Sequence, residues 1–70
     1  MPADPLMRSR ALAAAARADL AQGQLASAET NFRLALHYAP GDRRLQEELK
    51  QASEAREASR RVEPGTLPRR

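Results

Sequence analysis

Residues 28–40 read Ala-Glu-Thr-Asn-Phe-Arg-Leu-Ala-Leu-His-Tyr-Ala-Pro, and this stretch decides the fold of the chain. Ala28 and Phe32 are four residues apart and therefore lie on one face of a helix. The small residue lets a neighbouring helix approach closely, and the aromatic ring fills the space beside it. Pro40 stops the segment because proline lacks the N–H that a continuing helix needs. The stretch thus predicts a closely packed helix that ends at about residue 39.

The apolar stripe of this helix begins a turn earlier, so we predict a helix over residues 25–39. Its members recur at the period of a helix with one buried face: Leu25, Ala28, Phe32, Ala35, Leu36 and Ala39. Glu29 and Arg33 are four residues apart outside this stripe. We therefore expect them to form an ion pair away from the buried face.

The sequence predicts another helix over residues 5–22, before the helix over residues 25–39. Asp4 can cap its free backbone N–H groups, and Pro5 suits its first turn. Gly23 then supplies the left-handed residue that commonly terminates a helix. The apolar residues of this helix cover a wide arc, Leu12, Ala16 and Leu20 at a spacing of four with Ala11, Ala15 and Ala18 beside them. Such an arc indicates packing against more than one neighbour.

A third, more polar helix is predicted over residues 42–60, with Asp42 as its cap and with Leu45, Leu49 and Ala52 on one face. Residues 62–70 contain two prolines and a glycine and show no period, so we expect a disordered basic tail. The predicted organisation is an all-α, three-helix domain over residues 4–61 followed by that tail.

The composition predicts a thin hydrophobic core. The chain has 70 residues, and its large apolar side chains are mainly nine leucines, while fifteen alanines favour helix but bury little area. Cysteine is absent, which excludes disulfides and thiolate metal sites. Domains of this size are often marginal without such a supplement, so we expect a partner or self-association to add stability.

The helix–turn–helix pattern resembles one repeat of the tetratricopeptide family, placed over about residues 9–42. The residues that carry the resemblance are Leu12, Ala16, Leu20, Gly23, Ala28, Phe32, Ala35, Leu36 and Pro40. The chain departs from the family pattern at Asp19, where a tyrosine is usual. The third helix looks like the solvating helix that follows a final repeat. Because arrays normally need about three repeats, one repeat plus a helix cannot form a superhelix alone.

The resemblance implies a protein-binding surface, since the first helix of each repeat lines the peptide-binding face in that family. The residues it indicates are Arg10, Arg17 and Leu20, joined by Arg44 and Gln51 from the third helix. The arginines and Gln51 would form a polar rim able to hold a carboxylate or an acidic peptide. The alternative is that they are ordinary solvated side chains.

Some apolar residues lie outside the predicted buried faces of the hairpin. They are Leu6, Met7, Leu34 and Tyr38, of which we include Leu34 and Tyr38 among the partner-binding candidates. Exposed apolar residues grouped in this way usually mark a partner surface.

We expect no catalytic, cofactor or metal site. His37 is the single histidine, and no carboxylate or nucleophile stands at a spacing that defines a triad or a metal site. The apolar run over residues 11–16 is far shorter than the roughly 20 residues of a membrane-spanning helix. We expect a cytoplasmic, non-enzymatic protein.

Two functions follow from these patterns. The first is a protein–protein interaction module, a small adaptor or chaperone-like binder. The alternative is a small basic nucleic-acid-associated helical protein, indicated by a pI of about 10.6 and by an arginine-rich end that contains Arg60, Arg61, Arg69 and Arg70. Phosphate binding would weaken steeply with salt, whereas association through apolar faces would change little.

Overall fold

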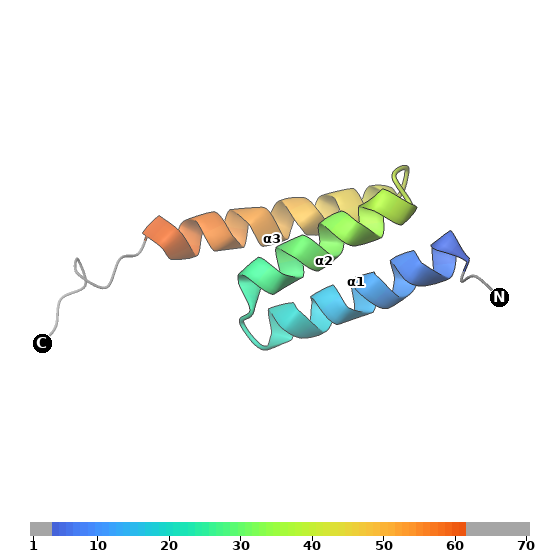
Figure 1. Cartoon of the computed structure of the whole chain (residues 1–70). Coiled ribbons are helices and arrows are strands. Elements are labelled where there is room, and N and C mark those ends of the chain that lie inside the picture. Colours follow the sequence, from blue (N-terminus) through green and yellow to red (C-terminus); the bar gives the residue numbers. More distant parts are fainter. Residues whose placement is uncertain (1–3, 62–70) are drawn as a thin grey trace, which may run out of the picture.

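The fold is a helical hairpin with a third helix along one side. The computed structural model describes residues 4–61, which form α1 (Pro5–Ala21), α2 (Leu25–Tyr38) and α3 (Arg43–Arg61) (Figure 1). No strand occurs in this range. Each helix begins and ends within one residue of its predicted bounds, and the predicted all-α class is confirmed. The predicted disordered tail lies outside the described residues.

The ends of α1 have the predicted local structure. The Asp4 Oδ1 atom accepts a hydrogen bond of 3.0 Å from the N–H of Leu6, and Pro5 occupies the first turn. At the other end Gly23 has a φ of 76°. This left-handed conformation reverses the chain between α1 and α2 and favours glycine because other residues have a Cβ that crowds the backbone.

The turn between α2 and α3 also matches its sequence signals. The helix stops at Tyr38, two residues before Pro40. Asp42 then caps α3, because its Oδ1 atom accepts a hydrogen bond of 3.1 Å from the N–H of Leu45. The short connections on both sides of α2 make neighbouring helices antiparallel.

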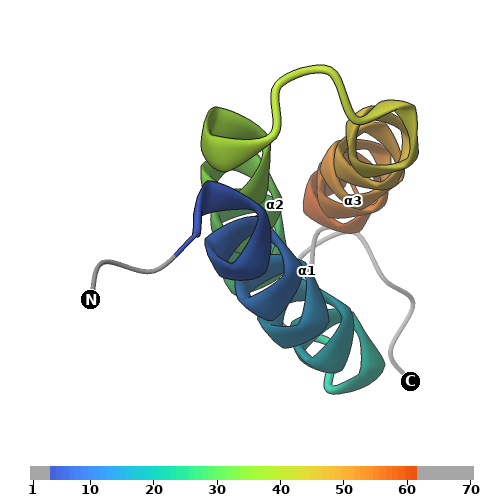
Figure 2. The ribbon, with the colours of Figure 1, turned by 90° about the vertical axis from the view of Figure 1, so that its right-hand side faces the viewer.

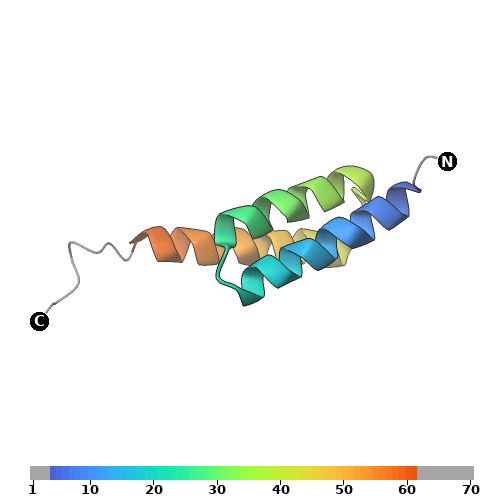
Figure 3. The same cartoon turned by 60° about the horizontal axis from the view of Figure 1, so that its bottom comes forward.

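α2 is the central helix of the domain. Figures 1 and 2 show α1 and α2 as an antiparallel pair with α3 along one side of it. Contacts are most numerous between α1 and α2, fewer between α2 and α3, and sparse between α1 and α3. Figure 3 shows the last turns of α3 extending beyond the α1–α2 turn.

Phe32 is the largest side chain in a core otherwise built mainly from alanine. It is completely buried, and the buried core residues are Ala13, Ala16, Ala28, Phe32, Ala35, Leu45 and Ala52. Leucines and one alanine that are partly buried pack around this cluster: Leu12, Leu20, Leu36, Ala39 and Leu49. The small residues let the helices approach closely, which is the packing that the sequence predicted for Ala28 and Phe32.

The expected wide buried arc of α1 is wrong. Ala11, Ala15 and Ala18 are exposed, and the buried face of the helix is restricted to Ser9, Ala13 and Ala16. The physical reason is that α3 packs chiefly on α2, so α1 has one main neighbour instead of two. Alanine tolerates this exposure because it favours helix without needing burial.

The position predicted for Glu29 also needs correction. Its ion pair with Arg33 forms, at 2.9 Å, but Glu29 is buried, with 6% of its surface exposed. Two residues of α3 complete its environment. Ser53 Oγ donates to Glu29 Oε2 at 2.7 Å, and Arg56 Nη1 donates to Glu29 Oε1 at 2.6 Å. Glu29 therefore holds α3 onto α2, which a pattern within α2 alone could not reveal.

Two further polar groups join α1 to α2. Ser9 is 2% exposed, and its Oγ donates to the Ala35 carbonyl at 3.0 Å. The Oδ2 atom of Asp19 accepts from Ser27 Oγ at 2.7 Å and from Asn31 Nδ2 at 2.8 Å. Asp19, the departure from the repeat pattern, thus fastens the hairpin near its turn.

Candidate functional site

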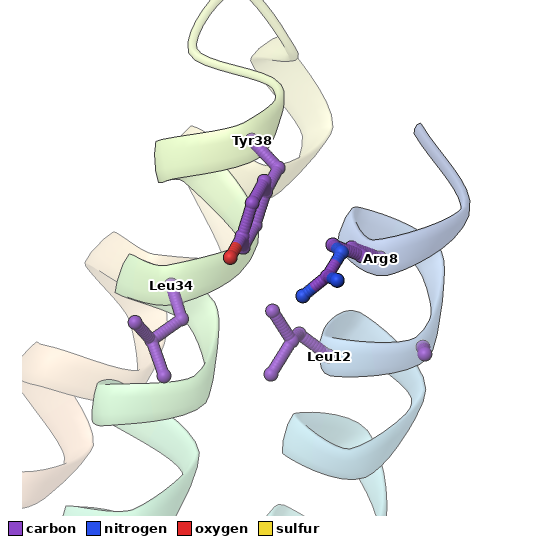
Figure 4. Close-up of a pocket in the computed structure, with 5 residues that line it drawn as sticks. Arg8, Leu12, Leu34 and Tyr38 are labelled. Carbon is purple, nitrogen blue, oxygen red and sulfur yellow. The ribbon is translucent and has the colours of Figure 1, made fainter. Parts of the chain in front are cut away.

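An apolar groove runs between α1 and α2, and we call it the outer groove. Its volume is about 280 Å³, and it is lined by Arg8, Ala11, Leu12, Leu34 and Tyr38. Figure 4 shows Arg8 and Leu12 extending from α1, and Leu34 and Tyr38 from α2, toward the space between the two helices. Among residues 43–60 of α3, none lines this groove, so the groove lies on the part of the hairpin that α3 leaves uncovered.

The outer groove combines exposed apolar surface with one positive charge. Leu34 is 44% exposed, whereas Leu12 and Tyr38 are partly buried. The guanidinium carbon of Arg8 lies 5.7 Å from the centroid of the Tyr38 ring, which is within cation–π range. Among residues 4–60, Arg8 forms no salt bridge. The groove can therefore accept an apolar side chain while Arg8 binds a carboxylate at its edge.

A second, more polar groove lies between α1 and the start of α3, and we call it the inner groove. Its volume is about 200 Å³, and it is lined by Leu6, Ser9, Arg10, Ala13, Arg17, Asp42 and Leu45. This is the location that the family resemblance implies for a peptide. The structure brings Arg10 and Arg17 together there, but Arg44 and Gln51 do not line the groove and are exposed.

Arg17 already has a partner within the domain. Its Nε and Nη2 atoms donate to Glu48 Oε2 and Oε1, each at 2.8 Å. The hydrogen bonds from Arg17 lower the pKa of the Glu48 carboxyl, and those same bonds raise the pKa of the Arg17 guanidinium. Arg10 is therefore the cation of the inner groove that has no salt bridge within the described part of the chain.

The predicted partner-binding residues thus fall into four groups, one of which, Arg44 and Gln51, lines neither groove. Leu34 and Tyr38 line the outer groove, and Arg10 and Arg17 line the inner one. Leu20 is partly buried and packs against the core, so its role in the structure is to hold the hairpin together. Their binding of a partner stays a prediction.

Sequence reasoning did not select Arg8 as a site residue. The available signal was its position four residues before Leu12, which places both side chains on one flank of α1. The pairing of Tyr38 with Arg8 depends on how α2 lies against α1. That relation comes from the tertiary structure and not from either helix alone.

Comparison of the chain with protein-family models, curated proteins and solved structures finds no match. The resemblance to a tetratricopeptide repeat therefore depends only on the pattern of residues between Leu12 and Pro40. The three helices of residues 4–61 are each too short or too polar to span a membrane. No group of three or more histidine, cysteine, aspartate or glutamate side chains is placed to hold a metal ion in that range.

Proposed function

We propose that the chain is a non-enzymatic protein-interaction module, a small adaptor or chaperone-like binder that works in the cytoplasm. The observation that carries this proposal is the outer groove, in which Leu34 remains 44% exposed beside Leu12 and Tyr38. An open apolar groove between two helices suits the apolar face of another protein segment. The resemblance to a tetratricopeptide repeat supports the same class of function.

The groove offers two kinds of interaction to such a partner. Removing Leu34, Leu12 and Tyr38 from water supplies hydrophobic stabilisation in proportion to the apolar area covered. Arg8 adds a charge-assisted hydrogen bond to a carboxylate, which fixes the orientation of the partner. We therefore expect the preferred partner segment to be apolar with an acidic residue at one end. Arg10 in the inner groove provides a second position for a carboxylate.

The proposal is tested by capture with matched variants of the tagged full chain. Leu34→Asp places a charge in the outer groove, whereas Thr30→Asp places the same charge on an exposed position of α2 that lines neither groove. We expect Leu34→Asp to lose the proteins that the natural chain retains, and Thr30→Asp to keep them. Equal melting temperatures of both variants exclude unfolding as the cause.

Unchanged capture by the Leu34→Asp variant would contradict the proposal for the outer groove. In that case Arg10→Glu, set against Arg44→Glu, tests the inner groove in the same assay. Arg44 is exposed and lines neither groove, so its reversal makes the same change in net charge while the lining of both grooves stays as it is.

The nucleic-acid alternative is supported by the net charge of +3 and the pI of about 10.6. It predicts a different salt dependence. Binding through phosphates would fall by orders of magnitude between about 50 and 200 mM salt if several phosphates were contacted. Association through the outer groove would change far less. Measuring capture of a labelled single strand and of protein partners across this range separates the two functions.

A further inference from the structure

One flank of α1 carries a charge pattern that is complementary to itself. Arg8, Leu12, Ala15 and Asp19 follow at spacings of four, three and four, so they form one strip along the helix, which we call the outer strip. A cation stands at one end, an anion at the other, and apolar residues lie between. The two charged positions are eleven residues apart, or about 16 Å along the helix axis at 1.5 Å per residue.

The carboxylate at the end of the outer strip has an unused oxygen. Both hydrogen bonds that the side-chain carboxylate of Asp19 accepts, from Ser27 and Asn31, are made to Oδ2. Its Oδ1 atom accepts none from the described residues and is not buried. Ser27 and Asn31 therefore hold the carboxylate in position while one oxygen remains available to an external donor.

The cation at the other end is likewise available. Arg8 is exposed, forms no salt bridge within residues 4–60, and is held over the Tyr38 ring at 5.7 Å. A guanidinium in this position can still donate to a carboxylate through its edge while its face contacts the ring.

We propose that the outer groove is covered by a second copy of this chain, with the two α1 helices antiparallel and Arg8 of each copy bound to Asp19 of the other. This inference rests on the proposed function and names the partner of the same groove. A two-fold axis that crosses α1 between Ala13 and Ala14 exchanges positions 8 and 19, and it also exchanges positions 12 and 15. Leu12 of one copy then packs on Ala15 of the other, a large residue against a small one.

Symmetry is the reason for choosing a second copy as the occupant. An interface between identical surfaces must be complementary to itself under a two-fold rotation, because otherwise like charges of the two copies would face each other. Reversal of the outer strip brings each charge opposite its counterion and keeps the apolar residues in the middle. The exposed Leu34 of α2 lies beside the strip and is covered in the same step.

The dimer is expected to be weak. Two helices about 25 Å long and about 10 Å wide present roughly 500 Å² on each copy, or about 1,000 Å² in total. This area is at the lower end for specific association. We therefore expect a monomer–dimer equilibrium that depends on concentration, and a dimer that loosens as salt screens the two ion pairs at its edge.

Sedimentation equilibrium of the full chain from about 1 µM to about 1 mM tests the pairing. Arg8→Glu and Asp19→Lys should each weaken self-association by about tenfold or more, because each places like charges opposite one another twice. A mixture of the two variants should associate again, since every charged contact in the mixed dimer is then between opposite charges. Recovery in the mixture is not expected from any general loss of folding.

A second pair of variants keeps the test valid if Asp19→Lys disturbs the hairpin. Ala15 and Ala14 are adjacent exposed residues of α1, and only Ala15 belongs to the outer strip. Ala15→Glu should abolish the dimer, whereas Ala14→Glu should leave it within about twofold of the natural chain. Circular dichroism of each variant confirms that the helices are retained.

Three results would overturn the pairing: a monomer at every concentration, equal weakening by Ala14→Glu and Ala15→Glu, or no recovery on mixing the two charge variants. A monomeric chain that still captures another protein in a Leu34-dependent way would overturn the pairing and leave the proposed function in place. A monomer that captures nothing would overturn both.

Discussion

Arg17 and Glu48 form a bidentate ion pair that joins α1 directly to α3. Both hydrogen bonds measure 2.8 Å, although the two helices otherwise make sparse contact. The pair closes the three helices into one unit, with α2 packed against both of the others. It also means that Arg17 has a structural role, so its loss would affect the fold as well as any ligand in the inner groove.

We expect the Arg17–Glu48 pair to contribute about 0.5 to 1 kcal/mol to the free energy of unfolding. The value is small because 42% of the Arg17 side chain is exposed and water screens the interaction. A double-mutant cycle with Arg17→Ala, Glu48→Ala and both together, measured by urea unfolding, isolates this coupling. The coupling should decrease in about 1 M salt. A coupling of zero at low salt would show that the pair contributes nothing to the free energy of unfolding.

Substitutions in the core should change the free energy of unfolding by more than loss of the Arg17–Glu48 pair does. Phe32→Ala should lower the free energy of unfolding by about 3 to 5 kcal/mol, because the ring is completely buried and alanine neighbours are too small to refill the space. Ala28→Leu should lower it by about 1 to 3 kcal/mol through overpacking at a residue with no exposed surface. Leu34→Ala, at a 44% exposed position, is the matched control and should change little. Thermal unfolding followed by circular dichroism measures all three, and an unchanged Phe32→Ala curve would contradict this core.

The helices and their ends could be predicted from sequence because their signals are local. The period of the stripe through Phe32, the glycine at residue 23 and the caps at Asp4 and Asp42 each act within a few residues. The burial of Glu29 could not be predicted in this way. Its partners Ser53 and Arg56 are more than 20 residues away, and only the packing of α3 on α2 brings them together.

The candidate site likewise combines residues that local sequence patterns predict with contacts that depend on how the helices pack. Leu34 and Tyr38 could be selected because they fall outside the buried stripe of α2. The groove they line also needs Arg8 and Leu12 from α1, and that juxtaposition depends on the register of the two helices. The polar rim follows from a family pattern, and such a pattern carries no information on ion pairs within this chain. It therefore does not predict the pair between Arg17 and Glu48.

Stability should fall in acid partly because of Glu29. Hydrogen bonds from Ser53 and Arg56 hold the pKa of its carboxyl below the usual value in the folded state. A folded-state pKa below the unfolded one means that the stabilisation is fully present above the unfolded pKa of about 4.3. It is then lost as the pH falls through the folded-state pKa.

Glu29→Gln tests this pH dependence. The substitution should cost about 1.5 kcal/mol or more at neutral pH, since the amide keeps only one acceptor oxygen and that oxygen carries no full charge. It should also flatten the decrease in stability below about pH 4.3, where the natural chain begins to lose its advantage. Urea unfolding at a series of pH values gives both quantities. Glu54→Gln, at an exposed acid of α3, is the control, and identical pH profiles for Glu29→Gln and the natural chain would exclude the assigned role.

Ser9→Ala should destabilise the domain only modestly, by about 0.5 to 1.5 kcal/mol. The Ser9 hydroxyl is buried and donates to the Ala35 carbonyl at 3.0 Å. That carbonyl also accepts the N–H of Ala39 at 3.0 Å, so removing the hydroxyl does not leave it unsatisfied. Ser9→Leu should be much worse, because the site is closely packed between α1 and α2. A smaller loss of stability for Ser9→Leu than for Ser9→Ala in thermal unfolding would show that a larger side chain fits at this position.

The turn between α1 and α2 gives a prediction with an internal control. Gly23 has a φ of 76°, whereas Gly41 lies outside the left-handed region, and a Cβ added at either glycine would meet no atom within 4 Å. Gly23→Ala should therefore cost about 1 to 2 kcal/mol from backbone strain alone. Gly41→Ala should be neutral or stabilising by up to about 1 kcal/mol, because it restricts the unfolded chain without straining the folded one. Urea unfolding measures the change in the free energy of unfolding for both variants. Only the change at Gly23 includes backbone strain. Equal free energies of unfolding would mean that the α1–α2 turn does not need a left-handed residue and that the hairpin is closed by Asp19, Ser27 and Asn31 instead.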